Sequence, residues 1–445
     1  MRKLRYGAVG IAGLIAASVG GVVPAVAQSP APVTISYLTH WGPDQVVQLQ
    51  AVADAYHAKN PNVTVEIRAV PFGDLLTTIK TQASSPGGPS IAGIYNLWLP
   101  ELARDAVVAP APEANVADIT ANWPASAVAG ASVDGVLYGY PNEINTYALN
   151  YNKRLFAEAG ITAPPATWDE LIADAKLLTK KDGDTITQQG FGLINSWAAG
   201  VVHPFYSLLA SDGGDIVNGT TPTLATGAAA DTFALYEKLV KELGVTAPEL
   251  GTADANTAGP FIDNFANGNT AMIIMANWWQ SSLKAAMGDK FSDIATAPIP
   301  VGPGGTASHP VSYEWLTVVN AKQTPEQQAA AWDFLQFLHG TDSGKTGSGM
   351  GEILIGMGII PSRTSDATAF ADKLSDPFLK TYVDSLPNAV PFPMILGGQE
   401  LSEMLQKKLE AIEFGELTAA DAAAQAQTEA GTILGQFYPA ASAAP

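Results

Sequence analysis

Short runs of β-branched and aromatic residues alternate with helical periodicity near the start of the chain. Val33–Thr39 reads VTISYLT, a composition typical of a β-strand. Pro43–Lys59 follows as a predicted helix, opened by proline and with apolar residues recurring every three or four positions. Residues 63–67 and 91–98 are the next two predicted strands, with a helix around residues 75–79 between them. This order predicts a parallel sheet with helices on both faces.

The later part of the chain continues the mixed α/β pattern. Residues 146–151 fit a strand, and Thr167 to Glu170 form a T-x-x-E capping box that opens a helix. The apolar run 270–276 is far too short for a membrane span and fits a buried strand. Further helices are expected in the segments 232–243, 325–338 and 398–412 and from residue 418 onward.

The first 27 residues have the pattern of a secretory leader. Arg2, Lys3 and Arg5 precede an apolar run, and Ala25-Val26-Ala27 is an A-x-A cleavage sequence. The run is short and rich in glycine for a membrane anchor, which is the alternative interpretation. We therefore expect cleavage before Gln28 and export to the periplasm. Residues 28–445 are too many for one hydrophobic core, so two domains are expected.

Composition excludes several classes of partner. Acidic residues outnumber basic ones by 42 to 23, for a formal net charge of −19. Nucleic acids and anionic lipid surfaces both require basic patches, so we expect neither as a partner. The chain has no Cys, which rules out a lipid anchor at the cleavage site and any disulfide. The five His show no metal-ligand spacing. We expect no metal and no cofactor.

Three blocks of residues together indicate a family. The first combines Tyr138-Gly139-Tyr140-Pro141 with LNYNKRLF at 149–156 and with segments 159–160 and 164–171. The second is GNTAM at 268–272 followed by Trp278-Trp279, and the third comprises segments 297–300, 318–322 and 331–335. In these blocks and their order, the chain resembles the extracellular solute-binding proteins of carbohydrate-type ABC importers, the maltose-binding group in the broad sense.

The resemblance implies a fold and a division of the chain. The fold class is α/β, with two lobes that are each a mainly parallel sheet flanked by helices and a ligand cleft at the hinge. The implied leader covers residues 1–27, the first lobe 28–143 and 305–342, and the second lobe 144–304 and 343–445. Segments 141–145, 301–308 and 341–346 are the expected crossings between lobes; the last two are rich in Gly, Pro and Ser.

The resemblance also implies a function. A monomer would capture a sugar or sugar derivative by hinge closure, without chemistry, and deliver it to the permease subunits of an ABC importer. It would touch the membrane only through that permease. The family's specificities do not transfer, because the aspartate often found in the third strand is missing from residues 91–97. Tyr313-Glu314-Trp315 also stand where relatives often carry small residues.

Tryptophan is abundant, with nine residues, and aromatic faces suit the C–H faces of pyranose rings. Trp41 and Trp98 follow predicted strands, at the carboxyl edge where open α/β sheets bind ligands. Trp278 is preferred over its neighbour Trp279, because adjacent residues on an extended segment point in opposite directions. Trp197 and Trp315 are further candidates for ligand binding, with a structural role as the alternative.

Polar candidates lie near the expected crossings. Glu143 and Glu314 would accept charge-assisted hydrogen bonds from sugar hydroxyls. Asn142 and Asn145 can both donate and accept, and His40 can do the same. The last candidate, Arg363, is the best-placed cation for an anionic ligand, with a surface salt bridge as its alternative role.

Three alternatives to a plain sugar remain open. The ligand is an anionic polyol derivative, such as a glycerophosphodiester or a sulfosugar, if Arg363 lies in the cleft. It is a cation if aromatic rings form a cage around an ammonium group. The protein is a secreted glycoside hydrolase if Glu143 and Glu314 form a carboxylate pair across a glycosidic bond.

Overall fold

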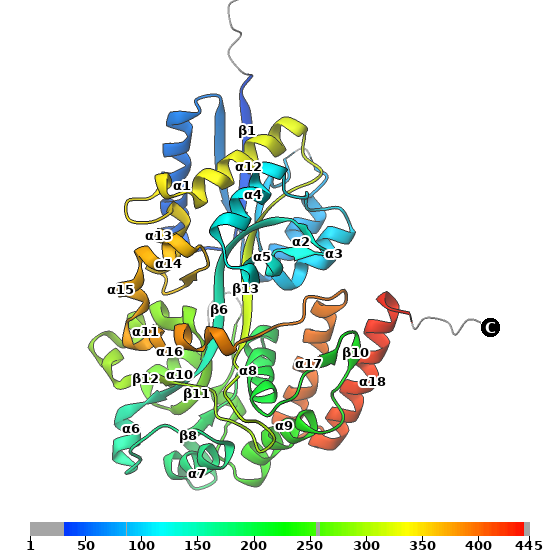
Figure 1. Ribbon diagram of the computed structural model, residues 1–445. Helices are drawn as coiled ribbons and strands as arrows, with labels where there is room; N and C mark the ends of the chain where they lie inside the picture. The colour runs from blue at the N-terminus through cyan, green and yellow to red at the C-terminus, as the bar shows by residue number, and fades with distance from the viewer. Residues whose placement is uncertain (1–30, 86, 255–258, 440–445) are drawn as a thin grey trace, which may run out of the picture.

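A mixed sheet of 11 strands runs through the molecule, and its main path has the order β2-β1-β3-β13-β6-β11-β8-β7. The computed structural model describes residues 31–85, 87–254 and 259–439. Figure 1 shows one group of elements above and another below, joined in the middle by the long strands β6 and β13. We call these groups the first lobe, built around β1–β3, and the second lobe, built around β8 and β11. The predicted leader lies outside the described residues.

The first lobe begins as the sequence predicts. Strands β1 (Val33–Thr39), β2 (Val63–Ala69) and β3 (Ile91–Tyr95) are parallel neighbours. The third strand ends at Tyr95, and residues 96–98 turn into a 3-10 helix. Helices of this lobe are α1 (Pro43–Lys59), α2 (Phe72–Gln82), α3 (Leu99–Arg104), α4 (Glu113–Asn122), α5 (Ala125–Gly130), α12 (Pro325–His339) and α13 (Gly349–Gly356). The short hairpin β4 (Ser132–Val133) and β5 (Val136–Leu137) follows α5.

The second lobe is built on β6, which also belongs to the first. Strands β11 (Thr270–Ala276) and β12 (Ile294–Ala297) pair antiparallel with β6, and β8 (Thr185–Gly192) pairs parallel with β11. The edge strand β7 (Lys180–Asp182) and the hairpin β9 (Val217–Asn218) and β10 (Thr221–Pro222) complete it. Its helices are α6 (Lys153–Glu158), α7 (Trp168–Leu178), α8 (Ala198–Ser211), α9 (Ala228–Glu237), α10 (Pro260–Asn267), α11 (Gln280–Met287), α16 (Pro377–Ser385), α17 (Gly398–Glu413) and α18 (Ala419–Phe437).

Two antiparallel strands connect the lobes. They are β6 (Gly139–Asn152) and β13 (Val311–Val319), and Trp315 lies opposite Glu143 in their register. A register shift interrupts the ladder between Trp315 and Leu316. The α/β class and the two lobes are confirmed, but the sheet is more mixed than expected. Strands that pass from one lobe to the other and back must run antiparallel, which breaks the parallel order in the middle.

Of the three segments expected to cross between the lobes, one lies in a strand that connects them and two lie outside the strands. Residues 141–145 lie within β6, whereas residues 301–308 lie beside the end of α8, where the Gly304 amide donates to Asp212. Residues 341–346 lie next to α12 and α13. The lobe boundaries themselves remain a prediction. One observation favours assigning α13 to the first lobe, because it packs against α1 and α12.

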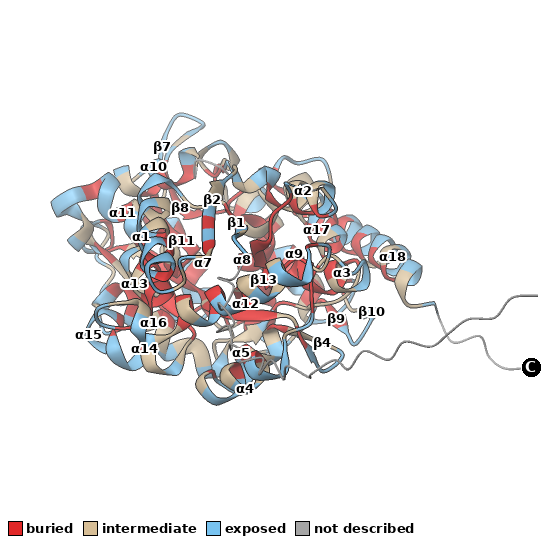
Figure 2. Ribbon diagram, turned by 90° about the horizontal axis from the view of Figure 1, so that it is seen from above, coloured by how far each residue is buried: buried red, intermediate tan, exposed pale blue. Residues whose placement is uncertain are grey.

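Burial is concentrated on the sheet and on the helices around it. Figure 2 shows buried residues along the strands and exposed residues on the outer faces of helices. Every residue of β11 is buried, and α8 is buried from Gly200 to Ser211. The predicted capping box opens α7, where Thr167 and Glu170 satisfy each other's backbone amides. Strand β14 (Ile360–Pro361), helices α14 (Thr364–Ala369) and α15 (Ala371–Leu374), and strand β15 (Val390–Pro391) connect the remaining elements. No helix among the described residues is long and apolar enough to cross a membrane.

Candidate ligand-binding cleft

A cavity of about 400 Å³ lies between the two lobes. Seven of the thirteen described lining residues are Phe, Tyr or Trp. The first lobe contributes residues that follow β1 and β2 and the last residue of β3. The second lobe contributes residues that follow β8 and β11, and the connecting strands contribute four more. The lining residues are His40, Phe72, Tyr95, Glu143, Asn145, Trp197, Ala199, Asp254, Trp278, Trp279, Ser282, Tyr313 and Trp315.

The connecting strands supply four of these residues at two-residue spacing. Glu143 and Asn145 come from β6, and Tyr313 and Trp315 come from β13. Side chains two apart on a strand share one face, and these four are opposite each other in register. Glu314, between the two β13 residues, therefore points to the other face of the sheet.

The first-lobe wall lies at the carboxyl ends of parallel strands, as expected for an open α/β sheet. His40 follows β1, Tyr95 ends β3, and Phe72 begins α2. The His40 ring lies 4.3 Å from the Trp315 ring, centroid to centroid. Burial lowers the pKa of His40 to about 4, so its imidazole is neutral near pH 7.

The second-lobe wall is made of three tryptophans. Trp278 and Trp279 stand in a 3-10 helix directly after β11, with ring centroids 3.9 Å apart. Because this turn is not an extended strand, both adjacent side chains reach the cavity. Trp197 lies 5.8 Å from Trp278, and its ring is 6.4 Å from Phe72 on the opposite lobe. The two walls thus come into contact through their aromatic rings.

The backbone before Trp197 is held in an uncommon conformation. Ser196 has φ of 68°, a region that non-glycine residues rarely adopt. Its amide donates to Oε1 of Glu410 on α17 at 2.6 Å. This contact fixes the turn that presents Trp197 to the cavity, and strained residues of this kind cluster at ligand sites.

The carboxylate of Glu143 is the charged centre of the cavity floor. Its Oε1 accepts a hydrogen bond from Nδ2 of Asn145 at 2.8 Å. The Asn145 carbonyl in turn accepts from Asn277 at 3.2 Å, and Asn277 also accepts from the Thr146 amide. Burial raises the pKa of Glu143 to about 7, although the Asn145 hydrogen bond acts in the opposite direction.

Tyrosine hydroxyls of the cleft are bonded within the protein. His203 on α8 lies between the hydroxyls of Tyr95 and Tyr147, with both N···O distances 2.9 Å. Burial lowers the pKa of His203 to about 3, so one ring nitrogen donates and the other accepts. The Trp278 indole donates to the Tyr313 hydroxyl at 2.7 Å. The first network links Tyr95 of the first lobe to α8 of the second lobe, and the second links β13 to the segment after β11.

The structure brings together six of the eleven candidates from the sequence. These six line the cavity: His40, Glu143, Asn145, Trp197, Trp278 and Trp315. Residues missed by the sequence analysis are Phe72, Tyr95, Ala199, Asp254, Trp279, Ser282 and Tyr313. Two of them carried a usable signal, since Tyr95 ends the third strand and Tyr313 is two residues before Trp315.

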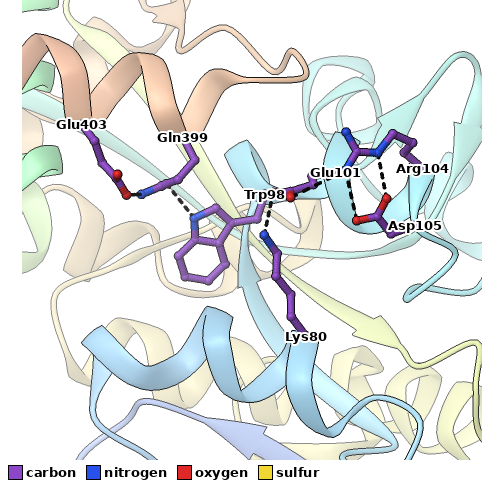
Figure 3. A network of polar contacts seen from close by, with 7 residues as sticks. All are labelled: Lys80, Trp98, Glu101, Arg104, Asp105, Gln399 and Glu403. Carbon is purple, nitrogen blue, oxygen red and sulfur yellow. Dashed lines mark hydrogen bonds and ion pairs between the residues drawn. The ribbon is translucent and has the colours of Figure 1, made fainter. Parts of the chain in front are cut away.

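Three other candidates lie outside the described cavity lining. The Trp98 indole donates to Gln399 of α17 at 3.0 Å (Figure 3). Its ring centroid lies 5.9 Å from that of Trp315. Asn142 is buried and accepts from the Thr317 hydroxyl. Trp41 is half-buried and packs against the first-lobe core.

Two charged candidates also lie outside the lining. Glu314 is buried on the far face of β13 next to Gly130 of α5, and burial raises its pKa well above the usual range. Arg363 lies over the ring of Trp123 and donates to the side chains of Asn122 and Ser365. It borders a separate groove with Asp333.

Comparisons with known proteins agree with this architecture. Residues 42–345 match the sequence profile of the family "Bacterial extracellular solute-binding protein". A protein of Brucella abortus (strain 2308), named as a binding protein, is 27% identical over 384 residues, which cover 85% of this chain and 88% of that protein.

Two solved structures share the fold. The GacH receptor of Streptomyces glaucescens, solved unliganded and with acarbose, has a TM-score of 0.77 at 23% identity and covers 91% of this chain and 99% of its own. Maltose-bound MalE3 of T. maritima has a TM-score of 0.75 at 21% identity, and the match covers 90% of this chain and 99% of MalE3. The family profile spans more than half of the chain and the fold is that of two-lobed binding proteins, so the chain belongs to the bacterial extracellular solute-binding proteins.

Proposed function

We propose that the chain is the substrate-binding component of an ABC importer and captures a sugar or sugar derivative in the cleft. The single observation that carries the proposal is the aromatic cavity between two lobes, with walls from both lobes and a floor on the strands that join them. Aromatic planes pack on pyranose rings, and the floor supplies hydrogen-bonding groups. The acarbose and maltose complexes of the two similar folds support this choice.

Capture requires no chemistry in this scheme. A ligand that touches Trp315 on one side and Trp197 on the other favours the closed arrangement by its differential affinity for it. The closed protein then docks on the membrane permease, after export directed by the leader sequence. The Glu143 and Glu314 side chains point to opposite faces of the sheet, so this pair does not flank one glycosidic bond as a hydrolase requires. Arg363 lies outside the cavity lining, which gives no support to an anionic ligand.

A thermal-shift screen of the chain from Gln28 onward tests the proposal. The panel contains mono-, di- and oligosaccharides, polyols, phosphorylated and sulfonated sugars, and choline. A ligand at about 100 times its Kd stabilises the protein by roughly 2.7 kcal/mol, a shift of a few degrees. A carbohydrate hit that is recovered intact by mass spectrometry supports the proposal. A hit that is hydrolysed, or a panel in which no carbohydrate shifts the transition, contradicts it.

A further inference from the structure

The charges of the cavity are of one sign. Among the thirteen described lining residues, Glu143 and Asp254 are acidic and none is Lys or Arg. His40, the only ionisable nitrogen group among these described lining residues, is neutral near pH 7 because burial lowers its pKa. Glu143 is 4% exposed and its hydrogen bond from Asn145 is to a neutral amide. A buried carboxylate without a cation beside it is costly, and a cationic ligand would remove that cost.

Each polar group of the floor already makes at least one hydrogen bond within the protein. The Asn145 amide donates to Glu143 and accepts from Asn277. The hydroxyls of Tyr95 and Tyr313 are bonded to His203 and Trp278. A neutral polyol needs matched donors and acceptors. Besides these groups, the floor presents a carboxylate and aromatic faces to the ligand.

The aromatic walls favour the same kind of ligand. The faces of Trp and Tyr rings carry partial negative charge and attract an ammonium group within about 6 Å. Trp197 is nearly perpendicular to Trp279 and at 73° to Trp278, so the second-lobe wall presents ring faces and edges in different directions. Trp315 adds a further ring from strand β13 of the floor.

We infer that the ligand carries a protonated amine, as an amino sugar or aminocyclitol does, and that this ammonium group pairs with Glu143 while the aromatic walls contact its ring. The inference rests on the proposed function, because it names the class of sugar derivative taken by the same cleft. Amine recognition by a carboxylate and aromatic faces differs from hydroxyl recognition in one measurable respect. It makes affinity depend on pH with a defined sign.

The sign follows from Glu143. An ammonium ligand requires the ionised carboxylate, so binding releases a proton wherever free Glu143, with a pKa of about 7, is protonated. Affinity therefore rises with pH between 5.5 and 6.5, by up to about tenfold per pH unit. A neutral sugar excludes more water from Glu143 and favours its protonated form. Its affinity is then constant or falls as the pH rises.

The tyrosines around Glu143 do not titrate between pH 5.5 and 6.5. Tyr37 on β1 and Tyr313 on β13 are close enough that the Glu143 charge raises the pKa of both, and Tyr95 on β3 is also raised by burial, so all three stay neutral. His40 titrates below the chosen range. Asp254 is the other carboxyl group of the described lining, and the variant Asp254→Asn separates its contribution.

The experiment uses matched sugars that differ in one substituent. Isothermal titration compares glucose, N-acetylglucosamine and glucosamine, then cellobiose, diacetylchitobiose and its deacetylated form, at pH 5.5, 6.0 and 6.5. We expect the amines to bind at least about tenfold more tightly than their neutral counterparts, with affinity rising with pH. Glu143→Gln should remove both the preference and the slope. Glu314→Gln, a buried carboxyl on the far face of the same sheet, should keep both.

The outcomes are distinct for the two proposals. If neutral sugars bind as tightly as the amines, or if the pH slope survives in Glu143→Gln, the amine inference is wrong while sugar capture stands. If no sugar binds but choline does, the cationic site is supported and sugar capture fails. If neither sugars nor choline bind to protein that unfolds cooperatively, both proposals are contradicted.

Discussion

The indole nitrogen of Trp98 donates to Oε1 of Gln399 at 3.0 Å, and this bond joins the 3-10 helix that follows β3 in the first lobe to helix α17 of the second lobe. Figure 3 shows that Gln399 in turn donates a hydrogen bond to Glu403 on the same helix. The ion pairs of Lys80 with Glu101 and of Arg104 with Asp105 lie nearby. Trp98 also packs beside Trp315, so the bond supports the cleft wall from behind.

Removing the hydrogen bond between Trp98 and Gln399 should lower the stability of the protein. Trp98→Phe removes the donor and part of a buried ring, and we expect a loss of about 1–3 kcal/mol in the free energy of unfolding. Urea denaturation monitored by circular dichroism measures it. Glu403→Gln, at the exposed end of the same network, should change stability by less than about 0.5 kcal/mol. Equal effects of the two substitutions would show that the indole bond is unimportant.

Removing one aromatic ring from the second-lobe wall should reduce the affinity for ligand more than it reduces the stability of the protein. Trp197→Ala deletes a half-buried ring of the second-lobe wall, and we expect affinity for the sugar found in the screen to fall by about 10–100-fold. The control is Trp41→Ala, a half-buried ring outside the cavity lining, which should keep affinity within about threefold. Titration calorimetry gives both values, and similar losses would place the ligand elsewhere.

The raised pKa of Glu143 gives the unliganded protein a defined dependence on pH. A carboxyl whose pKa rises from 4.5 to about 7 on folding binds more protons in the folded state, so its contribution to stability falls as the pH rises through that interval. Glu143→Gln removes this contribution. The free energy of unfolding of the variant, relative to that of the wild type, should therefore increase from pH 5 to 7.5, by about 2–3 kcal/mol at most.

The comparison with wild type is needed because other groups titrate in the same range. His203 and His339 have pKa values lowered to about 3, so they favour the folded state as the pH rises, opposite to Glu143. Urea denaturation of both proteins at four pH values isolates the Glu143 contribution as a difference. Parallel pH profiles would mean that Glu143 keeps an ordinary pKa.

A glycine contact behind the floor provides a second test of packing. A Cβ at Gly130 would overlap the Glu314 carboxylate, so Gly130→Ala should destabilise the protein by about 1–3 kcal/mol. Gly431 lies within α18, and a methyl group added there would meet no other atom within 4 Å, so Gly431→Ala should stabilise by about 0.5–1 kcal/mol. Thermal unfolding compares the two, and a stabilised Gly130→Ala would disprove the contact.

Local patterns were sufficient for elements and insufficient for the cleft. The bounds of β1 and α1 follow from residue type and periodicity, because strand and helix each impose a spacing on buried positions. The carboxyl-edge rule likewise found His40. Tyr313 and Trp279 were missed because their roles depend on strand pairing and on a 3-10 turn after β11. The sequence left the role of Arg363 open for the same reason, since it does not show which face a distant segment occupies.

Strands β6 and β13 carry both the floor of the cleft and the connection between the lobes. The connection between the lobes therefore includes a two-stranded antiparallel ribbon, and the register shift next to Trp315 is where we expect this ribbon to bend. We therefore expect a substitution at Trp315 to change the resting angle of the lobes as well as the ligand contact. Affinity measured on such a variant reports the sum of two effects, and only a lobe-angle measurement, such as small-angle scattering, divides them.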